Sequence, residues 1–385
     1  MAIPIAYNFR NLVVRKTTTI MTALGIALTV AMLLAILALV DGLKTALNAS
    51  GDPLRVVVLR KGSDSELVSN FDRAQFQDLK FKSGIAAGRD GQPLASLEMI
   101  TMANLGKEDA SDVNVNVRAL LAVGREVRPK VHIVSGRWYE PGQREMVVGR
   151  MLAEQHEGAR IGRKIEFGRG YWTVVGIMDG GGGATDSEIW ADLNQISMDT
   201  QRVQVLSSAT LQAVDAVAAK ALINDINNDQ RFDLTAKSEQ EYYDQQTVNA
   251  TPIRDVGLFV AIIMAVGSSF AAMNTMYAAV SRRAREIGTL RVLGFSRGSI
   301  LLSFFVESVL LSLLGGLLGC LLVLPLNRLS TQVGANFATL AFAFQVTPPT
   351  MAIGIVFAVV LGAVGGLFPA RMASRKEILT ALREV

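Results

Sequence analysis

Four long apolar segments constrain this 385-residue chain more than any other feature of its sequence. They occupy residues 19–40, 256–280, 300–326 and 351–368, and each is close to the roughly 20 residues that cross about 30 Å of hydrocarbon. A mostly polar stretch, 41–255, separates the first segment from the other three. The pattern predicts an α-helical membrane protein with four transmembrane helices and one large domain inserted between the first two, which excludes most soluble enzymes.

Basic residues orient these spans. Short loops rich in lysine and arginine stay in the cytoplasm, and the loop at 327–350 has only Arg328. We therefore expect residues 1–18, 281–299 and 369–385 to be cytoplasmic, and 41–255 and 327–350 to lie outside. The basic residues on the cytoplasmic side are Arg10, Arg15, Lys16, Arg282, Arg283, Arg285, Arg291, Arg297, Arg371, Arg375, Lys376 and Arg383.

The first segment has two further features. It is longer than the apolar core of a signal peptide, and no small-residue cleavage site follows it, so we expect an uncleaved anchor. The residues before it, within 1–18, place apolar side chains at helical spacing, which is typical of an amphipathic helix lying in the membrane interface. An ordinary helical lead-in to the first span is the other interpretation.

The net charge of +4 is unevenly distributed. Outside residues 41–255 there are 13 basic and 4 acidic residues, whereas within that range there are 25 basic and 30 acidic. Membrane topology and contact with anionic lipids account for the basic excess. We therefore expect membrane lipids, and no nucleic acid, among the partners.

The inventory of reactive side chains is small. Cys320 is the only cysteine, inside the third apolar segment, and His132 and His156 are the only histidines. An intramolecular disulfide and a cysteine zinc site are excluded, and we expect no metal site and no catalytic residues. The sequence has no Walker A motif, so any ATP hydrolysis is expected on a separate subunit.

Alternating and β-branched runs predict strands in the large domain, and helical periodicity predicts helices, so an α+β domain is expected. Its ends, near 41–47 and 238–247, are helix-compatible and predict stalks, with Ser238 as an N-cap. Glycines 180–183 predict a flexible loop. The predicted strands are 54–59, 113–117, 131–134, 146–148, 164–167 and 172–177, and the predicted helices are 151–156 and 211–227, the second with Val214, Val217, Leu222 and Ile226 on one stripe.

The loop at 281–299 carries the strongest local pattern. Ile287, Leu290 and Leu293 recur at helical intervals among arginines, and Gly294 is a helix stop. A short helix with an apolar stripe suits docking into a groove on a partner. The alternative is a basic loop that only orients the chain.

The sequence REIGTLRVLG within this loop resembles the signature of MacB/FtsX-like ABC transporter permeases. The segment at 8–30, the FPARMASR run near the C-terminus, and the segment 144–149 followed by 162–177 are also similar to that family. The tail departs from it, because Lys376, Glu377, Ile378 and Leu379 replace the usual Asp-Pro-Ile-Glu. The resemblance implies a four-span permease, without a fused ATPase domain, in the bacterial inner membrane.

The resemblance also implies partners: two copies of an ABC ATPase subunit, which binds ATP and Mg, and a second permease, either another copy of this chain or a related one. This chain itself is expected to bind no cofactor. A periplasmic adaptor protein is a further possible partner. The loop helix would be the coupling helix, with Arg282, Arg283, Arg285, Glu286, Ile287, Gly288, Leu290, Arg291, Leu293 and Gly294 as the ATPase-coupling residues.

Two features within the spans remain. Glu307 is an intramembrane carboxylate, which is a functional hypothesis by default, although pairing with a cytoplasmic-side arginine is the simpler interpretation. Small-residue faces permit close approach of helices, within the chain or between two copies. The expected packing glycines are Gly315, Gly316, Gly319, Gly362 and Gly366, with Gly365 beside them.

The expected function is transmission of ATP-driven motion from the ATPase to the extracytoplasmic domain, for efflux or for lipid or lipoprotein extraction. The alternative is a non-transporting regulator of cell-wall hydrolases, whose outer domains are typically much smaller. A membrane-anchored enzyme is disfavoured, because no nucleophile and base stand out.

Overall fold

The computed structural model describes residues 14, 16–105, 113–248, 251–327, 329–335 and 338–375. The described residues divide into a helical unit, within 1–41, 251–329 and 344–385, and a sheet unit, within 42–250 and 330–343. Of the expected amphipathic segment, only Val14 and Lys16 are described. Arg328 and the tail from Lys376 onward also lie outside the described residues.

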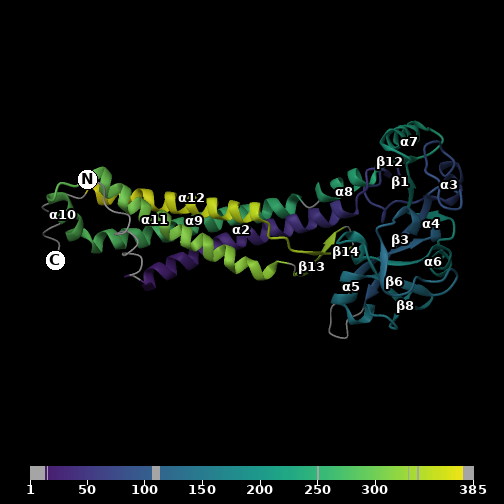
Figure 1. Cartoon of the computed structure of the whole chain (residues 1–385), viewed down its shortest axis with the longest axis horizontal. Coiled ribbons are helices and arrows are strands. Elements are labelled where there is room, and N and C mark those ends of the chain that lie inside the picture. Colours follow the sequence, from purple (N-terminus) through teal and green to yellow (C-terminus); the bar gives the residue numbers. More distant parts are fainter. Residues whose placement is uncertain are drawn as a thin grey trace. The chain divides into compact units, whose positions relative to one another are not determined.

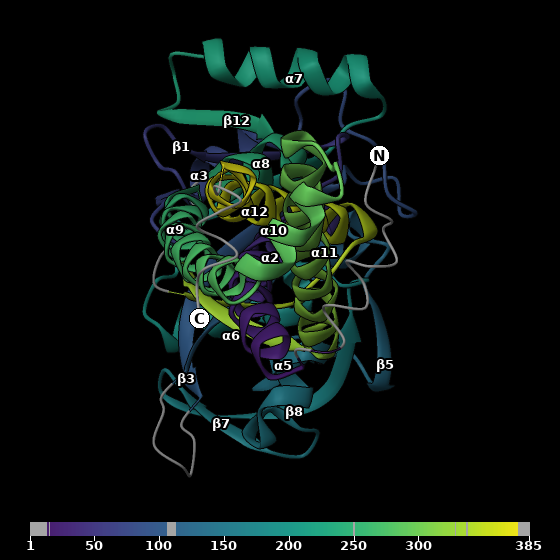
Figure 2. The ribbon, with the colours of Figure 1, turned by 90° about the vertical axis from the view of Figure 1, so that its left-hand side faces the viewer.

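The helical unit contains the helices that match the predicted spans. Four stretches, Thr19–Ser50, Arg254–Arg282, Arg297–Leu326 and Pro348–Arg375, are long and apolar enough to cross a membrane. Figures 1 and 2 show α2, α9, α11 and α12 running side by side as a bundle. The elements are α2 (Lys16–Ser50), α9 (Thr251–Arg282), α10 (Ala284–Val292), α11 (Arg297–Val323), η3 (Leu324–Leu326) and α12 (Pro348–Arg375).

Local signals explain where these helices begin. Pro252 and Pro348 stand in the first turns of α9 and α12, where proline's missing N–H costs nothing. Ser296 caps α11, and its hydroxyl accepts a hydrogen bond from the Ser299 backbone N–H at 3.1 Å. α2 continues past Val40 to Ser50, so the helical extension predicted after the first span is present.

The sheet unit is built on a mixed sheet flanked by short helices. Its strands are β1 (Arg55–Arg60), β2 (Phe71–Asp72), β3 (Ala95–Leu105), β4 (Val113–Leu120), β5 (His132–Gly136), β6 (Glu145–Gly149), β7 (Lys164–Phe167), β8 (Gly170–Asp179), β9 (Ile189–Asp192), β10 (Val205–Leu206), β11 (Ser208–Gln212), β12 (Leu234–Ser238), β13 (Ser330–Ala335) and β14 (Ala338–Ala343). Its helices are α3 (Arg73–Leu79), α4 (Ala122–Val127), α5 (Arg150–Gln155), η1 (Glu157–Ala159), η2 (Ala184–Ser187), α6 (Leu193–Asp199), α7 (Ala216–Asn228) and α8 (Glu239–Val248).

The main sheet has the strand order β12-β1-β11-β3-β4-β9-β6-β8-β5, with β7 paired to β8. β4 with β9 and β6 with β8 are parallel pairs, and the other pairs are antiparallel. Parallel neighbours need crossover connections, and short helices such as α5 supply them. The chain is thus a membrane protein with four candidate spans and a large α+β domain, as the sequence predicts.

The core of this domain lies between the sheet and its helices. Met99, Val117 and Trp172 from the strands form one apolar cluster with Leu193 of α6 and Leu222 of α7, and all five are buried. Burial of such side chains stabilises each by roughly 1.5–3 kcal/mol relative to exposure.

The six predicted strands are confirmed with small shifts of their ends, and the helix predicted at 151–156 is α5. The start of the next predicted helix is wrong. Leu211 belongs to β11, and α7 begins only at Ala216, where Asp215 accepts a hydrogen bond from the Ala218 N–H. The four residues predicted on one stripe do not share a face, because Leu222 and Ile226 are buried whereas Val214 and Val217 are 62% and 78% exposed.

Candidate functional site

The short helix predicted at 283–294 is α10, between α9 and α11. It ends in a Schellman motif, in which the Phe295 N–H donates to the Leu290 carbonyl at 3.1 Å and the Gly294 N–H to the Arg291 carbonyl at 3.2 Å. Gly294 has a φ of 90°, which glycine adopts without a steric penalty. The sequence signal for the helix stop is therefore correct.

The predicted coupling residues divide between two faces of this segment. Arg283, Ile287 and Gly288 are buried, while Leu290 and Arg291 are half-buried. The exposed members are Arg282, Arg285, Glu286, Leu293 and Gly294. The apolar stripe is therefore split, because Ile287 packs inside the chain whereas Leu293 is 65% exposed beside Val292 at 63%.

Ile287 belongs to an apolar cluster that joins α10 to three of the long helices. The other buried members are Met276, Val280, Ile300, Phe304, Ala370 and Ala373, which come from α9, α11 and α12. α10 is therefore a packed element of the helical unit. Its exposed apolar side chains lie at its far end, at Val292 and Leu293.

An ion pair fixes the start of α10. Arg283 donates from Nη1 to Glu307 Oε2 at 2.8 Å, and the exposed fractions of the two side chains are 3% and 7%. Its Nε also donates to Glu286 at 3.0 Å, and its guanidinium lies 5.0 Å from the ring centre of Phe304. Glu307 thus has a basic partner, which was the simpler of its two interpretations.

The five predicted packing glycines lie against helices of this chain. A Cβ on Gly315 would lie 2.8 Å from Ile26 Cβ, and one on Gly319 2.8 Å from the Ala27 carbonyl oxygen. On Gly316 it would lie 2.6 Å from Ala358 Cβ. A Cβ on Gly362 or Gly366 would lie closer still to Ser312 or Ser308 of α11, respectively. These glycines therefore permit α11 to approach α2 and α12.

Sequence reasoning missed a buried ionic cluster in the sheet unit. Arg118 of β4 donates to Glu66 and Glu188 at 2.8 Å and to Glu98 at 2.5 Å, and Arg128 pairs with the same Glu98 at 2.5 Å. Burial alone raises the pKa of Glu98, but Arg128 and Arg118 outweigh it and hold the pKa at about 2. The partners lie far apart in sequence, so no local pattern reveals the cluster.

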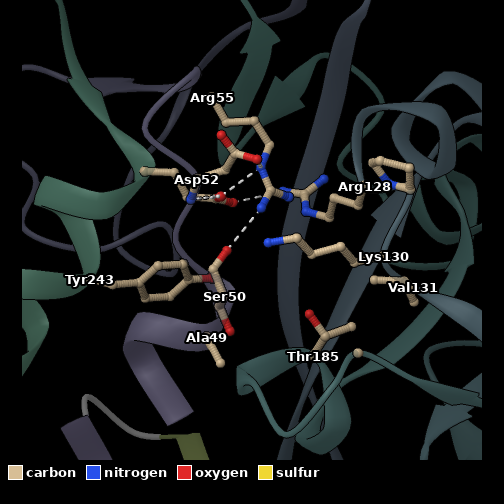
Figure 3. Close-up of a pocket in the computed structure, with 12 residues that line it drawn as sticks. Ala49, Ser50, Asp52, Arg55, Arg128, Lys130, Val131, Thr185 and Tyr243 are labelled. Carbon is tan, nitrogen blue, oxygen red and sulfur yellow. Dashed lines mark hydrogen bonds and ion pairs between the residues drawn. The ribbon is translucent and has the colours of Figure 1, made fainter. Parts of the chain in front are cut away.

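Next to this cluster lies a small pocket of about 40 Å³ (Figure 3). Arg55, Arg128 and Lys130 line it together with Asp52 and Glu239. Burial raises the pKa of Glu239 to about 6, against the opposing effect of Arg55 and Arg128. Within the described part of the chain, no three His, Cys, Asp or Glu side chains are placed to hold a metal ion.

Two family models match the chain: the MacB-like periplasmic core domain at residues 19–229 and the FtsX-like permease C-terminal at 258–378. The uncharacterized ABC transporter permease YknZ of Bacillus subtilis (strain 168) is 25% identical over 404 residues, covering 97% of this chain and 96% of that protein. The macrolide export ATP-binding/permease protein MacB of Hyphomonas neptunium is 25% identical, covering 97% of this chain but 59% of that protein. The crystal structure of the periplasmic region of MacB from Actinobacillus actinomycetemcomitans covers 52% of this chain and 94% of its own, with 12% identity and a TM-score of 0.39.

Proposed function

This chain belongs to the MacB/FtsX-like family of ABC transporter permeases, and we propose that it transmits the ATP-driven motion of a separate ATPase subunit to its extracytoplasmic domain. The work done there is efflux, or extraction of lipids or lipoproteins, from the bacterial inner membrane. In this proposal α10 is the coupling helix that the ATPase contacts.

The observation that carries the proposal is the attachment of α10. The buried pair of Arg283 and Glu307 joins its start to α11, and Ile287 packs among side chains of α9, α11 and α12. A force applied to α10 therefore reaches three long helices through direct contacts. The apolar end at Val292 and Leu293 stays open for a partner, as an element that docks in a groove requires.

The proposal includes the assembly. Two ATPase subunits, which hold ATP and Mg²⁺, bind two permease chains, either two copies of this one or this one with a related permease. In an efflux role, a periplasmic adaptor protein is a further partner. Native mass spectrometry of the co-expressed complex should give a mass containing two permease and two ATPase chains, and an ATPase-free active monomer would contradict this assembly.

Leu293→Asp tests the docking role. Because Leu293 is 65% exposed, the change leaves the fold intact, but it buries a carboxylate when the ATPase binds. The cost is on the order of 1–3 kcal/mol, which is roughly a 5- to 150-fold loss of affinity. The measurement is ATPase pull-down and ATP turnover in membranes that contain equal amounts of each permease.

Two further variants serve as controls for this measurement. Val217→Asp places the same charge at a site that is 78% exposed in the sheet unit, and it should bind the ATPase normally. Ile287→Asp buries a carboxylate inside the chain, so it should lower the amount of folded permease. Unchanged ATPase affinity in Leu293→Asp would remove the coupling role from the end of α10.

A further inference from the structure

The end of α2 and the start of α8 meet at one ion pair within the sheet unit. Arg55 donates from Nη2 to the carbonyl oxygen of Ser50, the last residue of α2, at 3.0 Å. Its Nε lies 2.8 Å from Oε2 of Glu239, the first residue of α8. The same carboxylate oxygen accepts a hydrogen bond from the Asp52 backbone N–H at 3.1 Å. One arginine thus contacts both helix ends, and Figure 3 shows Arg55 beside Ser50 at the end of α2.

Close backbone packing surrounds this pair. A Cβ on Gly51 would lie 3.0 Å from Gln240 Cα, so the residue after α2 lies directly against α8. The Ser50 hydroxyl accepts a hydrogen bond from the Ala184 N–H at 2.7 Å, next to the glycine loop at 180–183. Two segments that are distant in sequence therefore converge on Ser50 and Gly51.

The pair is also anchored to the sheet. Arg55 is the first residue of β1, and Arg55 and Glu239 are 6% and 2% exposed. Glu239 Oε1 lies 3.9 Å from Nη2 of Arg128, which in turn pairs with Glu98 of β3. A displacement of either helix end is thereby resisted by two strands of the main sheet.

We propose that Arg55 and Glu239 form a clamp that fixes the end of α2 to the start of α8, so that both act on the sheet as one element. The inference rests on the proposed function. α2 contains the first candidate span, and α8 precedes in sequence α9, which contains the second. The clamp is the joint at which motion of those spans enters the domain.

The charges around Glu239 make the clamp responsive to pH. Its pKa of about 6 means that the carboxylate gains a proton as the pH falls from 7 to 5, and the ion pair with Arg55 is then lost. Arg55 remains charged over this range. The charged or titratable groups that face Glu239 are Arg55, Arg128, Arg118, Glu98, Asp52 and Tyr243, and Lys130 lines the adjoining pocket.

The first experiment measures the clamp itself in the full chain. Spin labels on Asn48→Cys and Asp244→Cys, both exposed sites, report the distance between α2 and α8 in lipid nanodiscs, with Cys320→Ala as background. We expect a narrow distance distribution at pH 8 that broadens at pH 5. Glu239→Gln should give the broad distribution at both pH values.

Glu145→Gln is the matched control, because it removes a carboxylate that pairs with Arg137 elsewhere in the same unit. It should keep the wild-type response to pH. Tryptophan fluorescence confirms that each variant is folded, since Trp138, Trp172 and Trp190 all belong to the sheet unit. A folded Glu239→Gln with the narrow wild-type distribution at pH 8 would overturn the clamp.

The second experiment tests transmission, with a disulfide as a substitute for the ion pair. A Cβ on Gly51 would lie 3.6 Å from Gln240 Cβ, within the range that a disulfide spans. Hydrogen exchange of the sheet unit is measured with and without Mg·ATP, in the complex with the ATPase. We expect an ATP-dependent change in wild type, its loss in Glu239→Gln, and its return when Gly51→Cys and Gln240→Cys are added and oxidised.

Reducing the disulfide should abolish the response again, and the two cysteines without Glu239→Gln should leave it intact. A wild-type response in Glu239→Gln, or failure of the oxidised bridge to restore a lost response, would overturn the clamp as the point of transmission. A wild-type complex with no ATP-dependent change would instead contradict the proposed function, whatever the spin labels show.

Discussion

Arg283 and Glu307 form a buried ion pair across 24 positions of sequence, with 2.8 Å between Nη1 and Oε2. The carboxylate belongs to a candidate membrane span, and the guanidinium belongs to the turn that begins α10. A buried charge in such a helix needs a partner, and here the partner is the residue that connects α9 to the short helix. The acidic residue of the third span therefore has a structural tie to the candidate coupling segment.

Breaking this pair from one side should be costly. Arg283→Met leaves the Glu307 carboxylate buried without its main partner, and the expected loss of stability is about 3–5 kcal/mol. Arg283→Met combined with Glu307→Met removes both charges and should recover most of that loss. Thermal unfolding of the detergent-solubilised chain checks the comparison, and equal losses in the single and double variants would contradict the pairing.

The glycine at 319 should tolerate no side chain. A Cβ there would lie 2.8 Å from the Ala27 carbonyl oxygen and 2.9 Å from Val30 Cβ, so Gly319→Ala should lower stability by about 1–3 kcal/mol. Gly267 of α9 is the matched control, because a Cβ there meets nothing within 4 Å. Gly267→Ala should be neutral or slightly stabilising. Equal melting temperatures for Gly319→Ala and Gly267→Ala would contradict the close packing of α11 on α2.

The buried ionic cluster should give the sheet unit a distinctive acid response. The pKa of Glu98 is lowered from 4.5 to about 2, so its contribution to stability is present above pH 4.5 and is lost as the pH falls toward 2. Glu98→Gln should lack this part of the pH dependence. Tryptophan fluorescence during unfolding of the full chain between pH 2 and pH 6 measures it. An unchanged acid slope in Glu98→Gln would contradict the assignment.

Glu239 should act in the opposite direction. Its pKa is raised from 4.5 to about 6, because burial of the ionised carboxylate costs more than its pairs with Arg55 and Arg128 return. Its contribution to the free energy of unfolding is therefore present below pH 4.5 and is lost as the pH rises through 6, although the ion pair with Arg55 forms only in the ionised state. Replacing it with glutamine should therefore flatten the slope between pH 4.5 and pH 6 without affecting the slope below. The same fluorescence measurement separates the two carboxylates, with Glu145→Gln as the reference variant.

Membrane orientation gives a further prediction. An epitope inserted in the glycine loop at 180–183 should be accessible from outside intact spheroplasts, and one inserted after Gly294 only after permeabilisation. The reason is that the loop at 281–299 is rich in arginine, and the positive-inside rule keeps such loops in the cytoplasm. Labelling of the 180–183 epitope only in broken cells would contradict the four-span topology.

The sequence predicts this fold well where a pattern is local. The apolar segments predict the four long helices, and β-branched runs predict strands such as β1 and β8. β3, however, has the sequence ASLEMITMANL. Its first six residues are all buried, so this part of the strand does not alternate between buried and exposed side chains. From the sequence alone, Glu98 in this strand would be expected at the surface, because its partners Arg118 and Arg128 cannot be identified.

The coupling segment shows the same limit. Helical spacing correctly predicts α10 and its stop at Gly294, because both depend on neighbours in sequence. Spacing cannot show that Ile287 faces the chain while Leu293 faces solvent, because that depends on how α9 and α11 approach α10. The Arg55–Glu239 clamp was likewise missed, since its two residues come from opposite ends of the domain.

The position of β1 has a consequence for how this protein is made. Val57 is paired with Thr210 on one side and with Lys237 on the other, so β1 gains both neighbours only after nearly all of the domain has been synthesised. Until then its RVVVLR sequence has no strand neighbour, and late pairing of this kind makes folding slow. If the domain is exported, as the proposed topology requires, its synthesis would include an interval in which this strand edge is open to aggregation.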